Sequence, residues 1–485
     1  FGEGDAPSAA AERYLSEEFF PGATLLEPFA PEGASDDDWK VRAYPGGQHP
    51  SFASADDPGF VLDASIWIDL QDALDALEVH YQLPALEQLQ SPRALFDAQG
   101  RRLAALRELR RAPVAFLLEI GQWMWPAVRV GFEQEVEGPK RLLLRTLSLR
   151  PKIFEVRNFL AKDECADVMR IGMRRGLASS GVQGASDEGK APRTSEQVWV
   201  GSSQAPLLAA LDDRVAALTR VPKNHSEDLQ VVKYSENQYY HSHMDWTELE
   251  QHPDQQIIWK NAHFGFQDRL ATVFWYLNDV PAGGETVFPK HNQTVCAPKS
   301  RGGQDTVSCQ GSSEPDPASC EAGLRIRPAA GTALLWYNFH ASGRGDRNSM
   351  HGGCPVGAGY TKWSANKWVN IKPTGAKSNW MSKHPALSRH GWAGETSNNA
   401  CQITFTNEAF EEVAIMWKNP NTGDLTELSR VPPRSVVTQN SYRGHKFLLQ
   451  GRTRRTREVW CEPPLISFVL QGDFDLWVQK DMDEL

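Results

Sequence analysis

Apolar residues follow a helical spacing in one part of the N-terminal region. Between Trp67 and about Leu109, apolar residues recur at helical spacing, which places their side chains on one face of a helix. Residues up to about Asp63 show little periodicity and are rich in Ala, Gly, Pro and acids. We therefore predict an irregular arm and then a helical N-terminal region within residues 1–146. The leucines at helical spacing are Leu70, Leu74, Leu77, Leu103, Leu106 and Leu109.

From Leu147 the pattern changes to short runs of β-branched and aromatic residues, separated by turns of Gly, Pro and Asp. Such runs are typical of strands. Many short strands without repeated helices between them favour a barrel or a sandwich. We predict one such domain over residues 147–373, with a polar loop insertion at Lys299–Gly323. The clearest runs are Ile153–Val156, Val198–Val200, Leu229–Val232 and Ala271–Leu277.

A second β-rich block ends the chain. We predict a linker over residues 374–400, which are mostly polar. From Cys401 onward, Ile403–Asn407 and Glu412–Trp417 alternate between apolar and polar residues, as half-buried strands do. Residues 401–485 are therefore predicted to form a separate β domain.

Composition narrows the class of protein. The 485 residues are 40% hydrophobic and 10% aromatic, which suits a globular protein with a sizeable core. The net charge is −10 and basic residues are mixed with acidic ones, so we expect no nucleic-acid partner. The most apolar stretch, Ala115–Phe132, is interrupted by Glu119, Gln122 and Arg129, so we expect no membrane span.

Both ends of the chain bear on the compartment. The chain starts with Phe1 rather than methionine, and its last four residues, Met482–Leu485, are similar to the retrieval signal of lumenal proteins. We expect the endoplasmic reticulum lumen. Of the seven cysteines, Cys296, Cys309 and Cys320 fall in or beside the loop insertion, where a disulfide could restrain it. The pairing remains open.

Three residues suggest a metal site. His243 and Asp245 are two positions apart, so on an extended strand both point to one face, and His351 follows far downstream. Two imidazoles and one carboxylate leave three positions open on an octahedral ion, as in non-haem iron oxygenases. A His-x-Asp pair also occurs by chance, and the other candidate ligands are His241, His263 and His340.

The surrounding sequence resembles the prolyl 4-hydroxylase family. Tyr234–Asp245, Arg269–Pro289 and His351–Trp368 follow its motifs in order, with Arg193-Thr194-Ser195 upstream. The resemblance implies a mainly β protein with some α, whose catalytic domain is a double-stranded β-helix (jelly roll). It implies Fe(II), 2-oxoglutarate, O2 and ascorbate as cofactors, and hydroxylation of proline to 4-hydroxyproline in a proline-rich peptide, with release of succinate and CO2.

The resemblance also implies roles for individual residues. The iron ligands would be His243, Asp245 and His351. The 2-oxoglutarate site would be Lys362, Tyr240 and Thr286, and the lysine suits the distal carboxylate because it supplies a compact charge. The peptide site would be Arg193, Ser195, Glu227, Arg269 and Trp368. This chain departs from the family by one extra residue between Pro355 and Lys362, and by Asn370 where related enzymes often carry histidine.

The metal ligands alone do not select the substrate, because hydroxylases of lysine and of small molecules share them. The runs Gly283–Pro289 and Cys354-Pro355-Val356 look most like the prolyl enzymes. We therefore expect proline as the target.

The last block resembles the β domain of the von Hippel-Lindau tumour suppressor, a β-sandwich that binds hydroxyproline peptides. The resemblance rests on the Trp417 strand and on Ser441-Tyr442-Arg443-Gly444-His445. It implies a hydroxyproline pocket at Trp417, Ser441 and His445, although Leu428 and Phe447 replace two aromatic residues of that pocket. The alternative function is a catalytically weak binding protein that recognises hydroxyproline or proline-rich peptides through this domain.

Overall fold

The structure is a computed structural model of the 485-residue chain. It describes residues 6–31, 33, 38–53, 59–81, 93–180, 193–246, 269–292, 316, 318–371, 373, 400–407, 412–418, 425–433, 435–442, 446–450, 456–460, 467–471 and 476–480. The chain divides into two compact units. One comprises Phe1–Thr247 and Asp268–Ile371, and the other comprises Glu248–Gln267 and Lys372–Leu485.

The N-terminal region is built on a five-stranded antiparallel sheet in the order β3-β2-β1-β5-β4. The irregular arm is therefore a wrong prediction: short apolar runs with too little periodicity to recognise form β1 to β3. The first leucine repeat lies in α2, and Leu106 and Leu109 of the second lie in α3, so helix formation there is confirmed, but the region is not mainly helical. Its elements are α1 (Ala9–Glu12), β1 (Ala23–Phe29), β2 (Lys40–Pro45), β3 (Phe60–Asp63), α2 (Leu70–Tyr81), β4 (Ala94–Asp97), α3 (Leu106–Arg111) and β5 (Ala115–Leu118).

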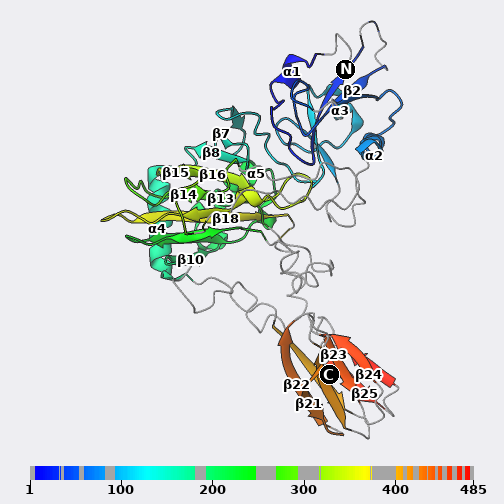
Figure 1. The fold of residues 1–485 in the computed structure, drawn as a ribbon, viewed down its shortest axis with the longest axis vertical. Coiled ribbons are helices and arrows are strands. Elements are labelled where there is room, and N and C mark those ends of the chain that lie inside the picture. Colours follow the sequence, from blue (N-terminus) through cyan, green and yellow to red (C-terminus); the bar gives the residue numbers. More distant parts are fainter. Residues whose placement is uncertain are drawn as a thin grey trace. The chain divides into compact units, whose positions relative to one another are not determined.

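A nine-stranded sheet forms the centre of the first unit (Figure 1). Its order is β6-β7-β8-β16-β13-β18-β11-β10-β9, so strands far apart in the sequence become neighbours. It begins at Glu133, ahead of the boundary predicted at residue 147. The strands are β6 (Glu133–Val136), β7 (Leu142–Ser148), β8 (Ile153–Arg157), β9 (Ala178–Ser179), β10 (Glu196–Val200), β11 (Leu229–Tyr234), β13 (Arg269–Tyr276), β16 (Ala333–Tyr337) and β18 (Lys362–Asn370).

A smaller sheet has the order β12-β17-β14-β15. Its strands are β12 (Tyr240–His243), β14 (Thr286–Phe288), β15 (Leu324–Ile326) and β17 (His351–Gly353). Side chains from both sheets share one apolar core, in which Trp336 of the large sheet contacts both Phe288 of the small sheet and Phe274 of the large sheet. The inner faces of the two sheets therefore face each other.

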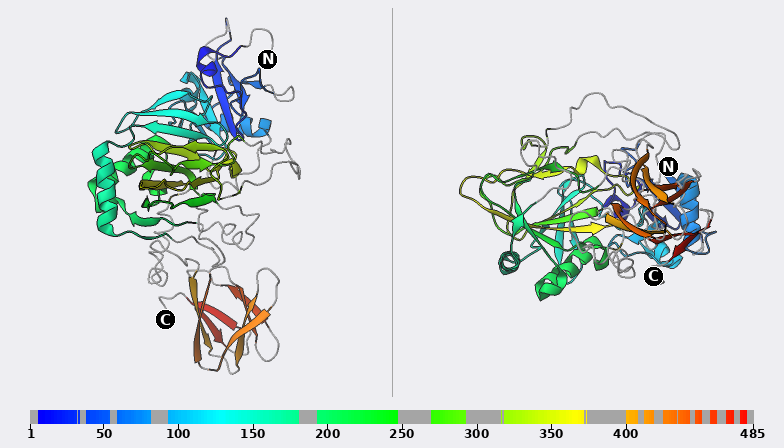
Figure 2. Two further views of the ribbon diagram at one scale, coloured as in Figure 1. Left: turned by 60° about the vertical axis from the view of Figure 1, so that its left-hand side comes forward. Right: turned by 90° about the horizontal axis from the view of Figure 1, so that it is seen from below.

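The helices α4 and α5 pack on the outer face of the large sheet, and Figure 2 shows helical segments along this sheet. Gly172 of α4 (Lys162–Arg175) lies against Val231, and a Cβ there would come within 3.0 Å of the valine side chain. Asp212 of α5 (Pro206–Thr219) forms an ion pair with Lys367, with 2.6 Å between Oδ1 and Nζ. Val231 of β11 and Lys367 of β18 therefore point to the outer face. Because side chains alternate along a strand, the even-numbered side chains of these two strands point to the inner face. Short 3-10 turns lie at Ser202–Gln204, Lys223–His225 and Arg347–Ser349.

The second unit contains two four-stranded sheets, in the orders β22-β19-β25-β26 and β21-β20-β23-β24. Phe405 of one sheet and Phe447 of the other are both buried, with ring centroids 6.2 Å apart. The strands are β19 (Ala400–Asn407), β20 (Val413–Lys418), β21 (Leu425–Val431), β22 (Ser435–Tyr442), β23 (Lys446–Gln450), β24 (Thr456–Trp460), β25 (Ser467–Gln471) and β26 (Leu476–Lys480). Within the described ranges, no helix has the length and apolar character needed to cross a membrane.

Candidate metal centre

The small sheet brings the three predicted metal ligands together. His243 ends β12, Asp245 lies two residues beyond it, and His351 begins β17. The two strands pair antiparallel, with His243 directly opposite His351. One ligand atom from each residue lies within 4.8 Å of the others. In the described part of the chain, no other group of three His, Cys, Asp or Glu side chains converges in this way.

Backbone carbonyls orient both imidazole rings. The Nδ1 atom of His243 lies 3.0 Å from the His241 carbonyl oxygen, and that of His351 lies 2.9 Å from the Ser349 carbonyl oxygen. A carbonyl only accepts, so Nδ1 carries the proton and Nε2 keeps its lone pair for a metal. The Nε2 atoms of His243 and His351 lie 3.8 and 3.5 Å from the Asp245 carboxylate.

Electrostatics favour the protonation states that a metal requires. Removal from solvent, and after it the charge of the neighbouring His351, lower the pKa of His243 to about 3, so this imidazole is neutral at physiological pH. Burial acts to raise the pKa of Asp245. The charges of His351 and Arg269 outweigh burial and hold that pKa below its usual value. Two imidazole nitrogens and one carboxylate fit Fe(II) as the metal.

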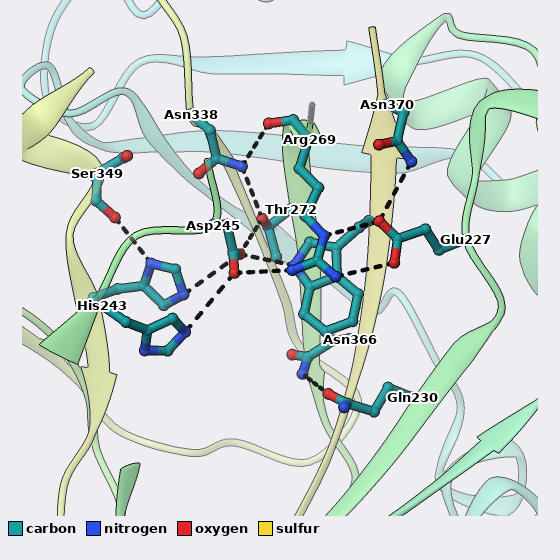
Figure 3. A network of polar contacts seen from close by, with 12 residues as sticks. Glu227, Gln230, His243, Asp245, Arg269, Thr272, Asn338, Ser349, Asn366 and Asn370 are labelled. Atoms are coloured by element: carbon teal, nitrogen blue, oxygen red, sulfur yellow. Dashed lines mark hydrogen bonds and ion pairs between the residues drawn. The ribbon is translucent and has the colours of Figure 1, made fainter. Parts of the chain in front are cut away.

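The Asp245 carboxylate is held by the large sheet. Thr272 of β13 donates its hydroxyl to Oδ2 over 2.7 Å, and Trp368 of β18 donates its indole N–H to the same oxygen over 2.8 Å. The guanidinium group of Arg269 lies 3.6 Å from Oδ1. Figure 3 shows Arg269 between Asp245 and Glu227.

A buried cation lies on the same inner face. Lys362 is 2% exposed, and its ammonium nitrogen lies 5.3 to 5.6 Å from the ring centroids of Phe274, Tyr234 and Tyr276. Among the described residues, no carboxylate forms an ion pair with this lysine. Burial lowers its pKa to about 7, while Glu285 acts weakly in the opposite direction. A buried ammonium group of this kind suits an anionic ligand.

Hydroxyl groups lie beside the lysine and the triad. Thr286 is 3% exposed and accepts a hydrogen bond from Tyr276, whose ring faces Lys362. The ring of Tyr240 stacks on His243 with centroids 3.8 Å apart. Burial raises the pKa of Tyr240 to about 12, so its hydroxyl remains a hydrogen-bond donor.

The residues predicted for the peptide site fall into two groups. Arg269 forms a two-pronged ion pair with Glu227, at 2.8 and 3.0 Å, and lies 3.7 Å above the Trp368 ring. Arg193 lies 4.6 Å above the Tyr240 ring and donates to Ser195 over 2.8 Å. Ser195 is 1% exposed, so its hydroxyl holds the Arg193 side chain from the buried side.

The sequence did not single out several residues that the structure places at the site. Thr272, Phe274 and Tyr276 alternate along β13, and their side chains all reach the ligand or lysine region. The period-two pattern of this strand could have placed them on one face. Asn338, which is fully buried behind Thr272, gave no local signal.

The remaining predicted residues do not join the metal site. Of the alternative metal ligands, His241 and His340 lie outside the triad, and His263 lies outside the described residues. In the second unit, Trp417 lies on β20 and Ser441 on β22, but the Ser441 side chain and all of His445 lie outside the described residues.

A disulfide ties the loop insertion to the strand that carries His351. Cys320 is bonded to Cys354, which follows β17. The predicted restraint of this insertion by a disulfide is therefore present for Cys320, and its partner lies three residues after His351. Cys296 and Cys309 lie outside the described residues.

Several known proteins are similar to this chain. Residues 229–370 match the 2OG-Fe(II) oxygenase superfamily. Probable prolyl 4-hydroxylase 4 of Arabidopsis thaliana is 30% identical over 231 residues, which is 47% of this chain and 70% of that protein. The transmembrane prolyl 4-hydroxylase of Homo sapiens is 35% identical over 215 residues, 41% of this chain and 42% of that protein. The viral collagen prolyl hydroxylase vCPH from Paramecium Bursaria Chlorella virus-1, solved with 2OG, matches with a TM-score of 0.31 and 21% identity, over 45% of this chain and 95% of that one.

The matched superfamily and the triad together define an iron- and 2-oxoglutarate-dependent oxygenase. At 30% identity over more than two thirds of the Arabidopsis protein, the chain belongs to the prolyl 4-hydroxylase family.

Proposed function

We propose that this protein hydroxylates proline within a peptide to 4-hydroxyproline. The reaction consumes O2 and 2-oxoglutarate and releases succinate and CO2, with one oxygen atom going to proline and the other to succinate. The observation that carries the proposal is the convergence of His243, Asp245 and His351 in a chain of this family.

The metal would be held by Nε2 of both histidines and by the Asp245 carboxylate. When bound, Fe(II) with 2-oxoglutarate supplies the activation of O2 that breaks an unactivated C–H bond. The protein's contribution is to hold the ligands in fixed tautomers and to keep them away from water. His243 keeps 26% side-chain exposure, against 9% for His351 and 2% for Asp245, so the site is open on the His243 side.

We assign the 2-oxoglutarate site to Lys362, Thr286 and Tyr240. Lys362 would pair with the distal carboxylate, since a buried ammonium group without a partner is costly and an anion removes that cost. Continuous packing links this lysine to the triad: Phe274 contacts Lys362 and Trp336, and the Trp336 ring lies 4.6 Å from that of His351.

We assign the peptide site to Glu227, Arg269 and Trp368, with Arg193 and Ser195 beside them. Proline-rich peptides adopt a polyproline II helix and dock on aromatic surfaces at low entropic cost. The Trp199 and Trp368 rings, tilted against each other with centroids 5.6 Å apart, offer such a surface next to the Arg269 guanidinium. Trp275 and Trp336 are fully buried and contribute to the core instead.

The domain organisation follows from these assignments. The two facing sheets would be the halves of a double-stranded β-helix, extended by β6 and β7, and the N-terminal sheet would be a separate domain of the first unit. The predicted linker, residues 374–400, lies almost wholly outside the described residues.

The test is mass spectrometry of proline-rich peptides incubated with the protein, Fe(II), 2-oxoglutarate and ascorbate, which keeps the iron reduced. We expect a gain of one oxygen on proline and an equal yield of succinate. Asp245→Ala should abolish both products. His49→Ala is the matched control, because this histidine pairs with Glu12 in the N-terminal region, away from the triad. Succinate without oxidised peptide across the panel would contradict a prolyl peptide substrate.

We further propose that the C-terminal unit is a β-sandwich similar to the von Hippel-Lindau β domain and that it holds proline-rich or hydroxylated peptide near Trp417. Support comes from the two four-stranded sheets and from Phe405 and Phe447, whose rings meet between them. Trp417 is partly exposed on β20. Aromatic side chains with partial exposure are common anchors for proline rings.

Peptide binding to the full chain, with and without hydroxyproline, tests this role. Trp417→Phe should weaken binding to both peptides while leaving succinate formation in the absence of peptide unchanged. Equal affinity of Trp417→Phe and wild type would contradict the assignment.

We also propose an oxidising compartment of the secretory pathway as the location. The Cys320–Cys354 disulfide supports it, because such bonds persist mainly in oxidising environments. Alkylation of free thiols in protein taken from cells, followed by peptide mapping, should leave both cysteines unmodified.

A further inference from the structure

A chain of hydrogen bonds runs from the large sheet to the carboxylate ligand, and its direction is determined by chemistry. Asn338 follows β16 and is fully buried. Its Nδ2 atom lies 2.9 Å from the Arg269 carbonyl oxygen and 3.1 Å from Thr272 Oγ1. A carbonyl cannot donate, so the side-chain atom facing it must be the amide nitrogen. The second N–H of the same amide then points at Thr272.

The hydrogen bond from Asn338 determines where the Thr272 hydroxyl donates. Its hydroxyl has one proton. Because the oxygen already accepts from Asn338, that proton is available for Asp245 Oδ2, 2.7 Å away. Figure 3 shows Thr272 lying between Asn338 and Asp245. We call this series, Asn338 to Thr272 to Asp245, the relay.

The relay and Trp368 together occupy one oxygen of the carboxylate. Oδ2 accepts from Thr272 and from Trp368, so both of its in-plane lone pairs are used. Among the described residues, none donates a hydrogen bond of this kind to Oδ1, which lies 3.6 Å from Arg269. The oxygen left for a metal is therefore Oδ1. Without the relay, the carboxylate could rotate toward the Arg269 guanidinium, which would then compete with the metal for it.

Asn338 also connects Asp245 to the other side of the site. Its main-chain carbonyl oxygen accepts a hydrogen bond from the Asp346 N–H over 2.8 Å. Asp346 caps the turn Arg347–Ser349, and the Ser349 carbonyl orients His351. One buried residue thus supports the segments behind two of the three ligands.

We propose that Thr272 and Asn338 are positioning residues that hold Asp245 for metal binding through the relay. The inference rests on the proposed function, since it concerns the same metal site. It adds two residues that touch neither substrate nor metal and whose effect passes through Asp245. Partners of this kind commonly change metal affinity by about 10- to 100-fold when they are removed.

The experiment measures Mn(II) affinity of the full-length protein without 2-oxoglutarate, by the loss of the free-ion electron paramagnetic resonance signal. We expect Thr272→Val to weaken binding by about 10- to 100-fold and Thr272→Ser, which keeps the hydroxyl, to retain wild-type affinity. Thr146→Val is the matched control, because Thr146 is equally buried and donates to the Ala127 carbonyl over 2.9 Å. It should lower thermal stability and leave Mn(II) affinity unchanged.

A double-mutant cycle tests whether the two residues act in series. If they do, Asn338→Leu weakens Mn(II) binding, and the double variant with Thr272→Val is no weaker than the weaker single variant. Additive losses overturn the relay, and so does wild-type affinity in Thr272→Val. If Thr272→Val does not fold, Asn338→Leu and Thr272→Ser decide: loss of affinity in the first and retention in the second support the relay, and any other pair of results overturns it. Wild-type protein that binds no Mn(II) would instead overturn the proposed function.

Discussion

The ammonium group of Lys362 lies 5.3 Å from the centre of the Phe274 ring, in a position where the lysine is 2% exposed. Burial lowers the pKa of this lysine to about 7. A cation in such surroundings is costly without an anionic partner. Both the affinity for an anionic ligand and the stability of the folded protein should therefore depend on the protonation of Lys362, and so on pH.

The affinity for 2-oxoglutarate should fall as pH rises above about 7. In the free protein Lys362 loses its proton with a pKa of about 7, whereas a bound carboxylate favours the protonated form and raises that pKa. Binding above pH 7 therefore takes up a proton, and the dissociation constant should rise by up to about tenfold per pH unit. Calorimetric titration of the metal-loaded protein between pH 6.5 and 9 measures it. Lys362→Arg should give a flatter profile, since arginine keeps its charge. A wild-type affinity that is constant over this range would contradict the role of Lys362.

Lys362→Met should stabilise the protein while removing 2-oxoglutarate binding. The pKa of Lys362 is lower in the folded protein than the ordinary lysine value of 10.5, so the unfolded chain binds more protons and folding is penalised at neutral pH. We expect a gain on the order of 3 kcal/mol in the free energy of unfolding at pH 7. The gain should shrink between pH 7 and 10.5. Thermal unfolding of the ligand-free protein measures it, and a lower stability of the variant would show that the lysine is compensated by other groups.

Reduction of the Cys320–Cys354 disulfide should destabilise the first unit. The bond closes a loop between residues 34 positions apart, for which the loss of chain entropy suggests about 3 to 4 kcal/mol. Because Cys354 follows the strand of His351, Mn(II) affinity should fall as well. Cys320→Ser and Cys354→Ser together, compared with wild type in thermal unfolding, test this. Cys165→Ala is the control, since Cys165 is a buried free thiol on α4.

Glu227→Gln should impair use of the peptide more than use of 2-oxoglutarate. Glu227 holds the Arg269 guanidinium with two hydrogen bonds, and a glutamine can accept only one of them. A loosely held Arg269 should raise the KM for peptide by about tenfold, since a charge-assisted hydrogen bond contributes about 1.5 to 3 kcal/mol. Steady-state kinetics with each substrate varied separately make the measurement. An equal effect on both KM values would contradict a specific role in peptide binding and would mean that Glu227 stabilises the site as a whole.

The triad was predictable from sequence because its signal is local. His243 and Asp245 are two positions apart in the sequence, and His351 stands in a long motif. The same holds for α2 and α3, whose leucines repeat at helical spacing. Strand positions in the catalytic region were also predictable, since β-branched residues alternate there with a period of two.

Tertiary structure alone decided what surrounds these residues. Local sequence patterns do not determine the order of strands in a sheet. In this sheet β13 lies between β16 and β18. That order places Thr272 beside Trp368 and Asn338 behind it, so that both can act on Asp245. It also buries Lys362 among three rings that come from two strands, Tyr234 of β11 and both Phe274 and Tyr276 of β13. The N-terminal sheet was missed for the same reason, because its short strands are stabilised by partners distant in sequence rather than by a periodicity of their own.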